Sequence, residues 1–229
     1  MWLALLLLLS CDALTRRDAV ARGLAAAALP QRWAPTDVGM RSLAFRAREA
    51  GPLPFARYPD PALRFAFARP VARFDADLRV VVAKLRDAAR ARGAEGLAAT
   101  QCGVDARIVV LGDAVFVNPV VARRSPEADL VPWRERCLAL PPDVTVETLR
   151  DRSLDVAARS PTHGARVVTR LEGAAARQFA HEFDHLRGIL VVDHAFETPA
   201  SAAYPPLAAL EAPYHAARRA RAWARELRP

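Results

Sequence analysis

The pattern of apolar and polar residues in the middle of the chain predicts two helices. Between residues 75 and 93, apolar side chains recur every three or four positions, which places them on one face of a helix. Asp75 is a suitable N-cap for this helix, and Gly93 is a suitable C-terminal stop. A second helix is expected over residues 173–187, with Gly188 ending it.

Short apolar runs between these helices predict a group of strands. They cover residues 107–111, 115–117, 144–148, 154–157 and 166–171. The connections between them are short, which suits antiparallel pairing rather than crossovers. After Pro205 and Pro206, a terminal helix rich in Ala and Arg is expected over 207–227. This order of helix, strands and helix indicates an α+β domain.

The first 50 residues have the composition of a presequence. Residues 2–9 form an apolar block that fits the core of a signal peptide and is too short to span a membrane, and Ala13 offers a cleavage site. The following stretch is rich in Arg and poor in acidic residues, as transit peptides are. A two-part presequence of this kind resembles those that carry proteins into plastids. The alternatives are a twin-arginine signal at Arg16 and Arg17, a mitochondrial address, and a secretory signal followed by a spacer.

These observations divide the chain into three parts. We expect a presequence over 1–50, a folded domain over 51–200 and a helical extension over 201–229. No run of about 18 apolar residues occurs, so no transmembrane segment is expected in the mature chain. Three cysteines are too few for a disulfide scaffold, and a hydrophobic fraction of 52% is enough to bury a core.

The net charge of +8 is carried by the ends of the chain. Residues 14–57 hold eight Arg and three acidic residues, and residues 215–229 hold five Arg and one acidic residue. The 20 basic and 20 acidic residues over 58–214 balance. A nucleic-acid-binding domain is expected to carry its basic side chains on the fold itself. The pattern therefore argues against recognition of nucleic acid by the fold and reflects a general bias toward Arg.

Residues 181–185 read His-Glu-Phe-Asp-His within the second predicted helix. A spacing of four residues places His181 and His185 one turn apart on the same face, where both imidazoles can bind one metal ion. Glu182 is rotated by about 100° from His181. It lies outside the ligand pair but within reach of a water molecule on the metal, from which it can take a proton. The alternative is an amphipathic helix whose His residues only pack.

The third ligand distinguishes the classes of metal site. Zinc proteases of the extended type place a further His six residues after the second, but this chain has Val191 there. A thermolysin-like site needs a downstream Glu, for which Glu197 and Glu211 are candidates. Cys137 is a better candidate, because a thiolate and two neutral imidazoles leave a divalent ion with one open position. A lone Cys is more often a small buried hydrophobic residue, so the residues around Cys137 matter.

Four segments occur in the order and approximate spacing typical of peptide deformylases. Residues 58–64 (Tyr-Pro-Asp-Pro-Ala-Leu-Arg) resemble the segment near the start of these enzymes. Residues 96–101 (Gly-Leu-Ala-Ala-Thr-Gln), 135–139 (Glu-Arg-Cys-Leu-Ala) and 181–188 resemble their three motifs. The chain thus resembles this family over roughly residues 55–195. The resemblance implies antiparallel β-sheets around a central helix carrying the His-Glu-x-x-His motif, with an N-terminal and a C-terminal helix.

The resemblance also implies an activity and its participants. The family is a metal-dependent amidohydrolase that removes the formyl group from the N-terminal methionine of new bacterial and organellar proteins. The implied partners are N-formylmethionyl nascent peptides and the organellar ribosome, and the implied cofactor is one divalent ion, Fe(II) or in its place Zn(II) or Ni(II). By matched position, the resemblance implies that the metal ligands are Cys137, His181 and His185, and that Glu135 supports them. It implies that Glu182 is the general base and that Gln101 and the Leu138 backbone donate hydrogen bonds to the oxyanion. The implied substrate-binding residues are Gly96, Leu97, Glu95 and Arg136.

The chain departs from the family pattern beside the expected peptide groove. Ala94 and Glu95 stand where Gly and an apolar residue are usual, and Arg136 and Ala139 stand where Gly and Ser are usual. Arg136 could narrow the groove or favour the neighbouring thiolate electrostatically. We expect an active enzyme with altered substrate preference or lower turnover. The alternatives are a deformylase-like protein that binds metal or peptide without turnover, and a secreted zinc protease that uses Glu211 as a ligand.

Overall fold

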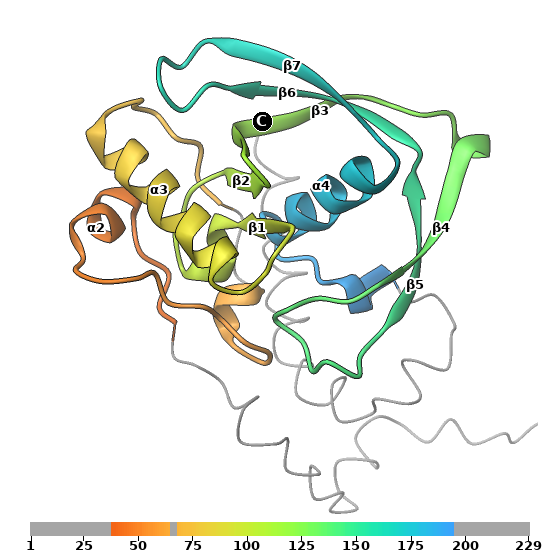
Figure 1. The fold of residues 1–229 in the computed structure, drawn as a ribbon, viewed down its shortest axis with the longest axis horizontal. Helices are drawn as coiled ribbons and strands as arrows, with labels where there is room; N and C mark the ends of the chain where they lie inside the picture. Colours follow the sequence, from red (N-terminus) through yellow and green to blue (C-terminus); the bar gives the residue numbers. More distant parts are fainter. Residues whose placement is uncertain (1–37, 65–67, 195–229) are drawn as a thin grey trace, which may run out of the picture. The chain divides into compact units, whose positions relative to one another are not determined.

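A computed structural model describes residues 38–64 and 68–194 of the chain (Figure 1). The helices are α2 (Leu43–Arg48), α3 (Ala76–Arg90) and α4 (Gly173–His185). The strands are β1 (Gly96–Ala98), β2 (Ile108–Leu111), β3 (Ala114–Arg124), β4 (Leu130–Glu135), β5 (Val146–Asp151), β6 (Ser153–Arg159) and β7 (Arg166–Glu172). Short 3-10 turns connect them: η2 (Pro61–Leu63), η3 (Ala99–Cys102), η4 (Glu127–Asp129) and η5 (Val191–His194).

The strands form two antiparallel sheets. One has five strands in the order β1-β2-β3-β6-β7, and the other consists of β4 and β5. Helix α4 contacts strands of both sheets and lies at the centre of the described part of the fold (Figure 1). The predicted α+β class, with antiparallel sheets around this helix, is confirmed. The terminal helix expected over 207–227 lies outside the described residues.

The sequence predicted both long helices and five of the strands, with shifted ends. The strand expected at 144–148 lies at Val146–Asp151, and the one expected at 115–117 is only the first part of β3. Strands β1 and β4 were not predicted. β4 contains Pro132, which disfavours a strand except at an edge, and β1 is only three residues long and begins with Gly96.

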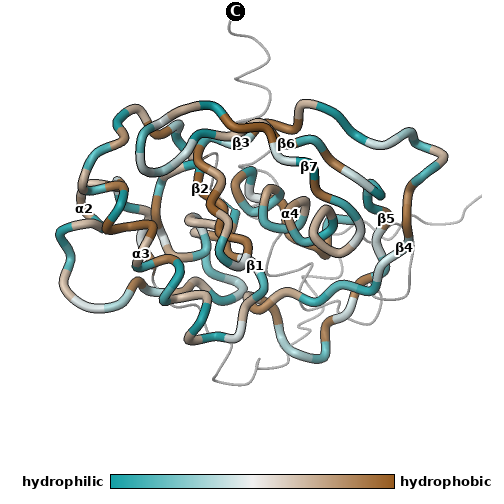
Figure 2. Tube along the Cα trace, turned by 45° about the horizontal axis from the view of Figure 1, so that its top comes forward, coloured by the Kyte–Doolittle hydropathy of each residue, from teal (hydrophilic) through white to brown (hydrophobic). Residues whose placement is uncertain are grey.

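Strand β2 is buried on both faces because α3 and α4 pack against opposite sides of the sheet. Ile108 and Val110 belong to an apolar cluster that includes Leu85 of α3. Val109 points the other way and packs in a second cluster with Phe179 of α4. Along a strand that is covered on both faces, apolar and polar residues do not alternate. Strand β2 is accordingly a continuous hydrophobic stretch of the trace in Figure 2.

Residues 38–50 belong to the folded part of the chain, although their composition groups them with the presequence. The side chain of Val38 is buried, and Ser42 caps α2 by accepting a hydrogen bond from the Phe45 N–H at 3.2 Å. The start of the folded part therefore does not coincide with the boundary drawn at residue 50. None of the described helices is both long enough and apolar enough to cross a membrane.

The N-cap of α3 gives a test of this part of the fold. The Asp75 carboxylate accepts a hydrogen bond from the Leu78 N–H at 3.2 Å, so Asp75→Ala leaves a helix N–H without its partner. We expect the free energy of unfolding to fall by about 1 kcal/mol in urea denaturation. Asp87→Ala is the matched control, because Asp87 is 74% exposed and its one ion pair among the described residues is with Arg90 at 3.6 Å. Equal losses in both variants would contradict the capping role.

Candidate metal and catalytic site

Helix α4 and the loop after β4 bring one thiol and two imidazoles together. His181 and His185 lie one turn apart on α4, with ring centroids 5.1 Å apart. The Cys137 Sγ lies 3.3 Å from the His185 Nε2. One ligand atom from each of these three buried side chains lies within 4.8 Å of the other two. The structure thus joins residues that are more than 40 positions apart in the sequence.

The donor set fits a divalent transition metal. One sulfur and two imidazole nitrogens are ligands that Zn(II) and Fe(II) accept. The His181 Nδ1 is bonded to the Glu135 carboxylate at 2.7 Å, which leaves its Nε2 for a metal. The His185 Nδ1 is buried and has no hydrogen-bond partner among the described residues. Metal-binding His residues are commonly oriented by a carboxylate in the way Glu135 orients His181.

The electrostatics of the site favour the thiolate form of Cys137. Burial opposes ionisation, but the neighbouring His185 and His181 more than offset it and lower the pKa of the thiol from 9.0 to about 5. Cys102 provides the contrast within the same fold: burial raises the pKa of its thiol to about 12. Since the thiolate is the form that binds metal, Cys137 is suited to this role and Cys102 is not.

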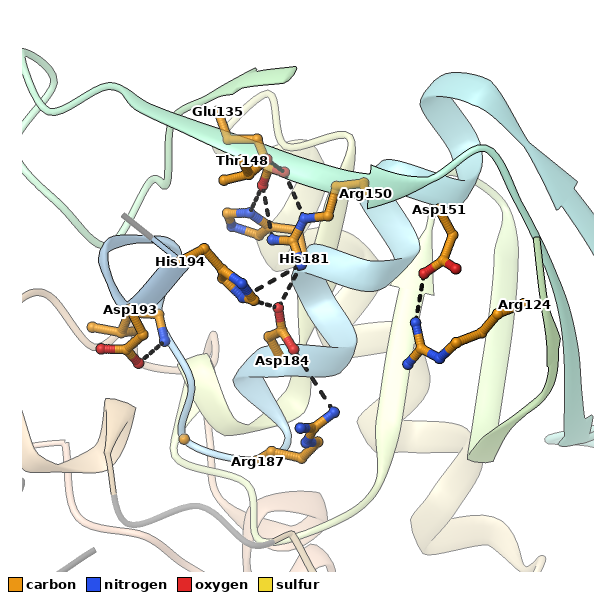
Figure 3. A network of polar contacts seen from close by, with 12 residues as sticks. Arg124, Glu135, Thr148, Arg150, Asp151, His181, Asp184, Arg187, Asp193 and His194 are labelled. Atoms are coloured by element: carbon orange, nitrogen blue, oxygen red, sulfur yellow. Dashed lines mark hydrogen bonds and ion pairs between the residues drawn. The ribbon is translucent and has the colours of Figure 1, made fainter. Parts of the chain in front are cut away.

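A buried network of charges supports His181 (Figure 3). The Glu135 carboxylate accepts hydrogen bonds from the Thr148 hydroxyl at 2.6 Å and the Arg150 Nε at 2.7 Å. Arg150 also donates to Asp184 at 2.7 Å. Although burial disfavours its charge, hydrogen bonds with His181 and Arg150 hold the pKa of Glu135 well below its usual range. Glu135, which the resemblance implies supports the ligands, thus contacts one of them directly.

Sequence reasoning did not assign the other members of this network. Asp184 lies within the His-Glu-x-x-His segment, where it bonds both Arg150 and His194, the latter at 2.7 Å. Thr148 and Arg150 alternate with exposed residues along β5, so that both face inward. An Arg on the buried face of a strand is the signal that could have revealed the network, because a buried guanidinium needs a carboxylate partner.

Glu182 lies beside the triad with one oxygen unpaired. Its side chain is buried, and its Oε1 accepts a hydrogen bond from the Gln178 amide at 2.7 Å. Its Oε2 is buried without a partner among the described residues. Burial raises the pKa of this carboxyl, which brings it closer to the range useful for proton transfer.

Gly96 is required by the close approach of β1 to this carboxylate. A Cβ atom at Gly96 would lie 2.8 Å from the Glu182 Cγ and 3.0 Å from the Gln178 amide nitrogen. The resemblance implies that Gly96 binds substrate, and in the structure its missing side chain also makes room for Glu182.

Gln101 lies on η3, which is tied directly to the metal-site helix. The hydroxyl of the adjacent Thr100 donates to the backbone carbonyl of His185 at 3.1 Å. The Gln101 side-chain oxygen accepts from the Ala98 N–H at 2.8 Å, so its amide nitrogen is left without an acceptor among the described residues. The backbone N–H of Leu138, next to Cys137, likewise has no acceptor in the described part of the chain.

The four expected substrate-binding residues lie in different environments. Gly96 faces Glu182, and the Leu97 side chain is fully buried in the core, so only its backbone can meet a ligand. Glu95 is 76% exposed and pairs with Arg177 of α4 at 3.3 Å. The Arg177 Cζ in turn lies 5.4 Å from the centroid of the Trp133 ring. Arg136 is exposed between the buried residues Glu135 and Cys137.

The downstream alternatives for a third ligand gain no support from the described residues. Val191, at the position of the third His of extended zinc proteases, is a buried apolar residue. Glu197 and Glu211 lie outside the described residues. His194 is hydrogen-bonded to the Asp184 carboxylate at 2.7 Å.

Comparison with known proteins agrees with this geometry. The model of the polypeptide deformylase family matches residues 52–199. The chain is 36% identical over 140 residues to a peptide deformylase of Thermotoga maritima, covering 59% of this chain and 82% of that protein. It is 34% identical over 172 residues to the chloroplastic/mitochondrial peptide deformylase 1B of Arabidopsis thaliana, covering 71% of this chain and 61% of that protein.

Solved structures give the same result. A plant peptide deformylase 1B superposes with a TM-score of 0.64 at 32% identity, covering 73% of this chain and 93% of that chain. The peptide deformylase of Plasmodium falciparum, in complex with an inhibitor, superposes with a TM-score of 0.62 at 30% identity, covering 69% of this chain and 98% of that chain. On these findings the chain belongs to the peptide deformylase family, metal-dependent hydrolases that remove the N-formyl group from nascent peptides.

Proposed function

We propose that this chain deformylates nascent peptides in an organelle, with Cys137, His181 and His185 holding one divalent cation and Glu182 moving the proton. The observation that carries the proposal is the convergence of the three ligand atoms within 4.8 Å of one another, beside a buried carboxylate with an unpaired oxygen. Sulfur and imidazole ligands suit Fe(II), Zn(II) and Ni(II), and the resemblance to the family favours Fe(II). Such a cation supplies a Lewis acid that polarises the formyl carbonyl and activates water.

Glu182 serves as general base and then as general acid in this proposal. Its unpaired Oε2 takes a proton from the attacking water and returns it to the amine nitrogen that leaves from the formyl carbon. The buried setting that raises the pKa of Glu182 makes the protonated form accessible in the second step. Gln178 holds the other oxygen at 2.7 Å and so fixes the orientation of the carboxylate.

Gln101 and Leu138 are proposed to stabilise the oxyanion. The amide nitrogen of Gln101 and the backbone N–H of Leu138 have no acceptors among the described residues, so both are available to the formyl oxygen. The Gln101 amide is held in place because its oxygen accepts from the Ala98 N–H. One donor of this kind typically contributes about 2.7–4 kcal/mol to lowering the barrier.

The substrate peptide is proposed to add to the free edge of β1. This strand stands at one end of the five-stranded sheet and pairs only with β2 among the described strands. An extended peptide can bind such an edge through main-chain hydrogen bonds. The Glu95–Arg177 pair and the exposed Arg136 border this region with charge, which we propose alters the preference for peptide sequence rather than abolishing turnover.

A plastid is the proposed location. The support is the two-part composition of residues 1–50 together with similarity to plant relatives named as chloroplastic. The catalytic domain is proposed to extend over 51–200, preceded by the folded residues 38–50 and followed by residues 201–229 as a C-terminal extension. The organellar ribosome is proposed as the place where nascent substrates are met.

Replacement of Glu182 tests the proposed mechanism. Glu182→Gln keeps the shape of the side chain and its hydrogen bond to Gln178 but removes the base. We expect kcat for deformylation of a short formyl-Met peptide, measured with Fe(II) loaded anaerobically, to fall by about 100- to 10,000-fold. Bound metal per chain should stay the same, whereas Cys137→Ser should lose the metal.

Two outcomes would contradict this mechanism. Formate release that persists in Glu182→Gln would exclude this residue as the base. Proteolysis that is lost in Glu211→Ala but retained in Cys137→Ser would support the zinc-protease alternative instead.

The hydrogen bond between Glu135 and His181 predicts an effect on metal affinity. Glu135→Gln removes the negative charge that orients His181 and pairs with Arg150. The dissociation constant for Zn(II), measured by competition with a chromophoric chelator, should rise by about 10- to 100-fold. Thr148→Val removes one neutral hydrogen bond to the same carboxylate and should have a smaller effect. An unchanged affinity in Glu135→Gln would show that this carboxylate does not support the metal.

Arg136 provides a test of substrate preference. Its exposed guanidinium should favour formyl-Met peptides with an acidic second residue over those with a basic one, and this preference should weaken at high salt. Arg136→Gly should remove the preference and raise kcat/KM for a neutral peptide by up to about tenfold, which corresponds to about 1.4 kcal/mol. Arg134→Ala, a neighbouring exposed Arg on β4, is the control. A wild-type chain without turnover that Arg136→Gly activates would instead indicate an impaired deformylase.

A further inference from the structure

The segment before the family match contacts the turn that carries Gln101. We call residues 38–46 the N-terminal arm; it precedes residues 52–199, which the family model matches. The Arg41 N–H donates to the Gly103 carbonyl at 2.8 Å, and the Asp105 N–H donates back to the Arg41 carbonyl at 2.8 Å. These two hydrogen bonds form a parallel bridge between Arg41 and Val104. The arm thus pairs with the chain immediately after η3.

Arg46 fixes the arm to the same carbonyl. Its side chain is only 5% exposed, which is rare for Arg unless the guanidinium is fully paired. The Arg46 Nε donates to the Gly103 carbonyl at 3.3 Å, and one terminal nitrogen donates to the Gly39 carbonyl at 2.8 Å. The other terminal nitrogen pairs with Glu49 at 2.5 Å. The Gly103 carbonyl therefore accepts from both the backbone and the side chain of the arm.

The fit between the arm and the turn leaves no space at Gly103. This residue ends η3 in the left-handed region, with a φ of +64°. A Cβ atom there would lie 2.7 Å from the Val38 Cγ1 and 2.8 Å from the Arg46 guanidinium. The arm and the end of η3 are packed directly against each other, so a shift in one must move the other.

The turn is consequently held between the arm and the metal-site helix. On the inner side, the Thr100 hydroxyl donates to the His185 carbonyl at 3.1 Å. The carbonyl of Gln101 itself accepts from the Ala56 N–H at 2.7 Å. Gln101 lies between these anchors, two residues before Gly103. On the C-terminal side of Gln101, the arm holds the turn through its hydrogen bonds to the Gly103 carbonyl.

We propose that the N-terminal arm, through Arg46, is a positioning element for Gln101. This inference rests on the proposed role of Gln101 in stabilising the oxyanion. A displacement of about 1 Å at a catalytic group can cost about 100-fold in rate, so the contacts of Arg46 with the end of η3 contribute to turnover without touching substrate. It follows that any removal of a presequence must leave the chain from Val38 onward in the mature enzyme.

A double-mutant cycle in the full chain tests this proposal. Arg46→Met removes the donors to Gly103, Gly39 and Glu49 while keeping an unbranched side chain. We expect kcat for a formyl-Met peptide to fall by about tenfold, with KM and bound metal unchanged. In a Gln101→Ala background, itself slower by about 100- to 1,000-fold, Arg46→Met should cause no further loss. Amide hydrogen exchange at residues 100–104 should be faster in Arg46→Met, which reports the loosened turn without measuring activity.

Arg48→Met is the matched control, because Arg48 lies on the same helix, its side chain is 74% exposed and, within the described part of the chain, it pairs only with Asp77 at 3.3 Å. It should leave kcat and the exchange rates unchanged. If Arg46→Met does not fold, Arg46→Lys, which keeps the charge but loses the fork of donors, is carried through the same cycle.

Two results would overturn the proposal. One is a full tenfold loss that persists in the Gln101→Ala background, which would indicate a general structural role for Arg46. The other is unchanged kcat in the folded Arg46 variant. Full activity in Gln101→Ala alone would instead refute the proposed role of Gln101 and, with it, the reason for positioning this residue.

Discussion

The hydrogen bond between Glu135 and His181 is the contact on which the site depends. Glu135 ends β4, and His181 lies on α4, so this 2.7 Å contact joins the two-stranded sheet to the central helix. The loop that follows Glu135 carries Cys137, whose Sγ lies 3.3 Å from the His185 Nε2. Keeping a buried carboxylate ionised is costly unless it is paired and hydrogen-bonded. Arg150 and Thr148 of β5 complete that pairing, so the second sheet is held to the helix by polar contacts as well as by packing.

The two buried glutamates of the site have opposite environments, and these suit different roles. Glu135 is surrounded by donors, and hydrogen bonds with His181 and Arg150 outweigh burial and keep its pKa low. Glu182 receives one hydrogen bond from Gln178, and burial dominates and raises its pKa. A carboxylate that stays ionised can orient a ligand, while one with a raised pKa can exchange a proton. The structure therefore separates the supporting acid from the proton-transferring acid by the number of donors around each.

Much of this arrangement could be predicted from the sequence, because the features concerned are local. Helical spacing located α3 and α4, and the i, i+4 relation of His181 and His185 placed both rings on one face. The contact between Cys137 and that helix is long-range, so residue spacing cannot predict it. Only the resemblance to the family indicated it. The inward orientation of Arg150 could not be predicted either, because it depends on the register between β5 and β4. Strand β4 contains Pro132 and was not predicted.

The first residues of the folded part were grouped with the presequence for a different reason. Residues 38–49 are rich in Arg and Ala, and composition alone cannot distinguish a transit-like segment from an amphipathic arm. What distinguishes them is the burial of Arg46 against backbone carbonyls near Gln101. Gly96 stands at an expected substrate-binding position, and the structure adds that its missing side chain admits that of Glu182.

X-ray absorption spectroscopy of the metal-loaded protein would test most directly whether Cys137 and the two His residues share one cation. With Zn(II) bound, we expect one sulfur scatterer at about 2.3 Å and two imidazole nitrogens at about 2.0–2.1 Å, and the sulfur signal should vanish in Cys137→Ser. A first shell of nitrogen and oxygen atoms alone in the wild-type protein would contradict it.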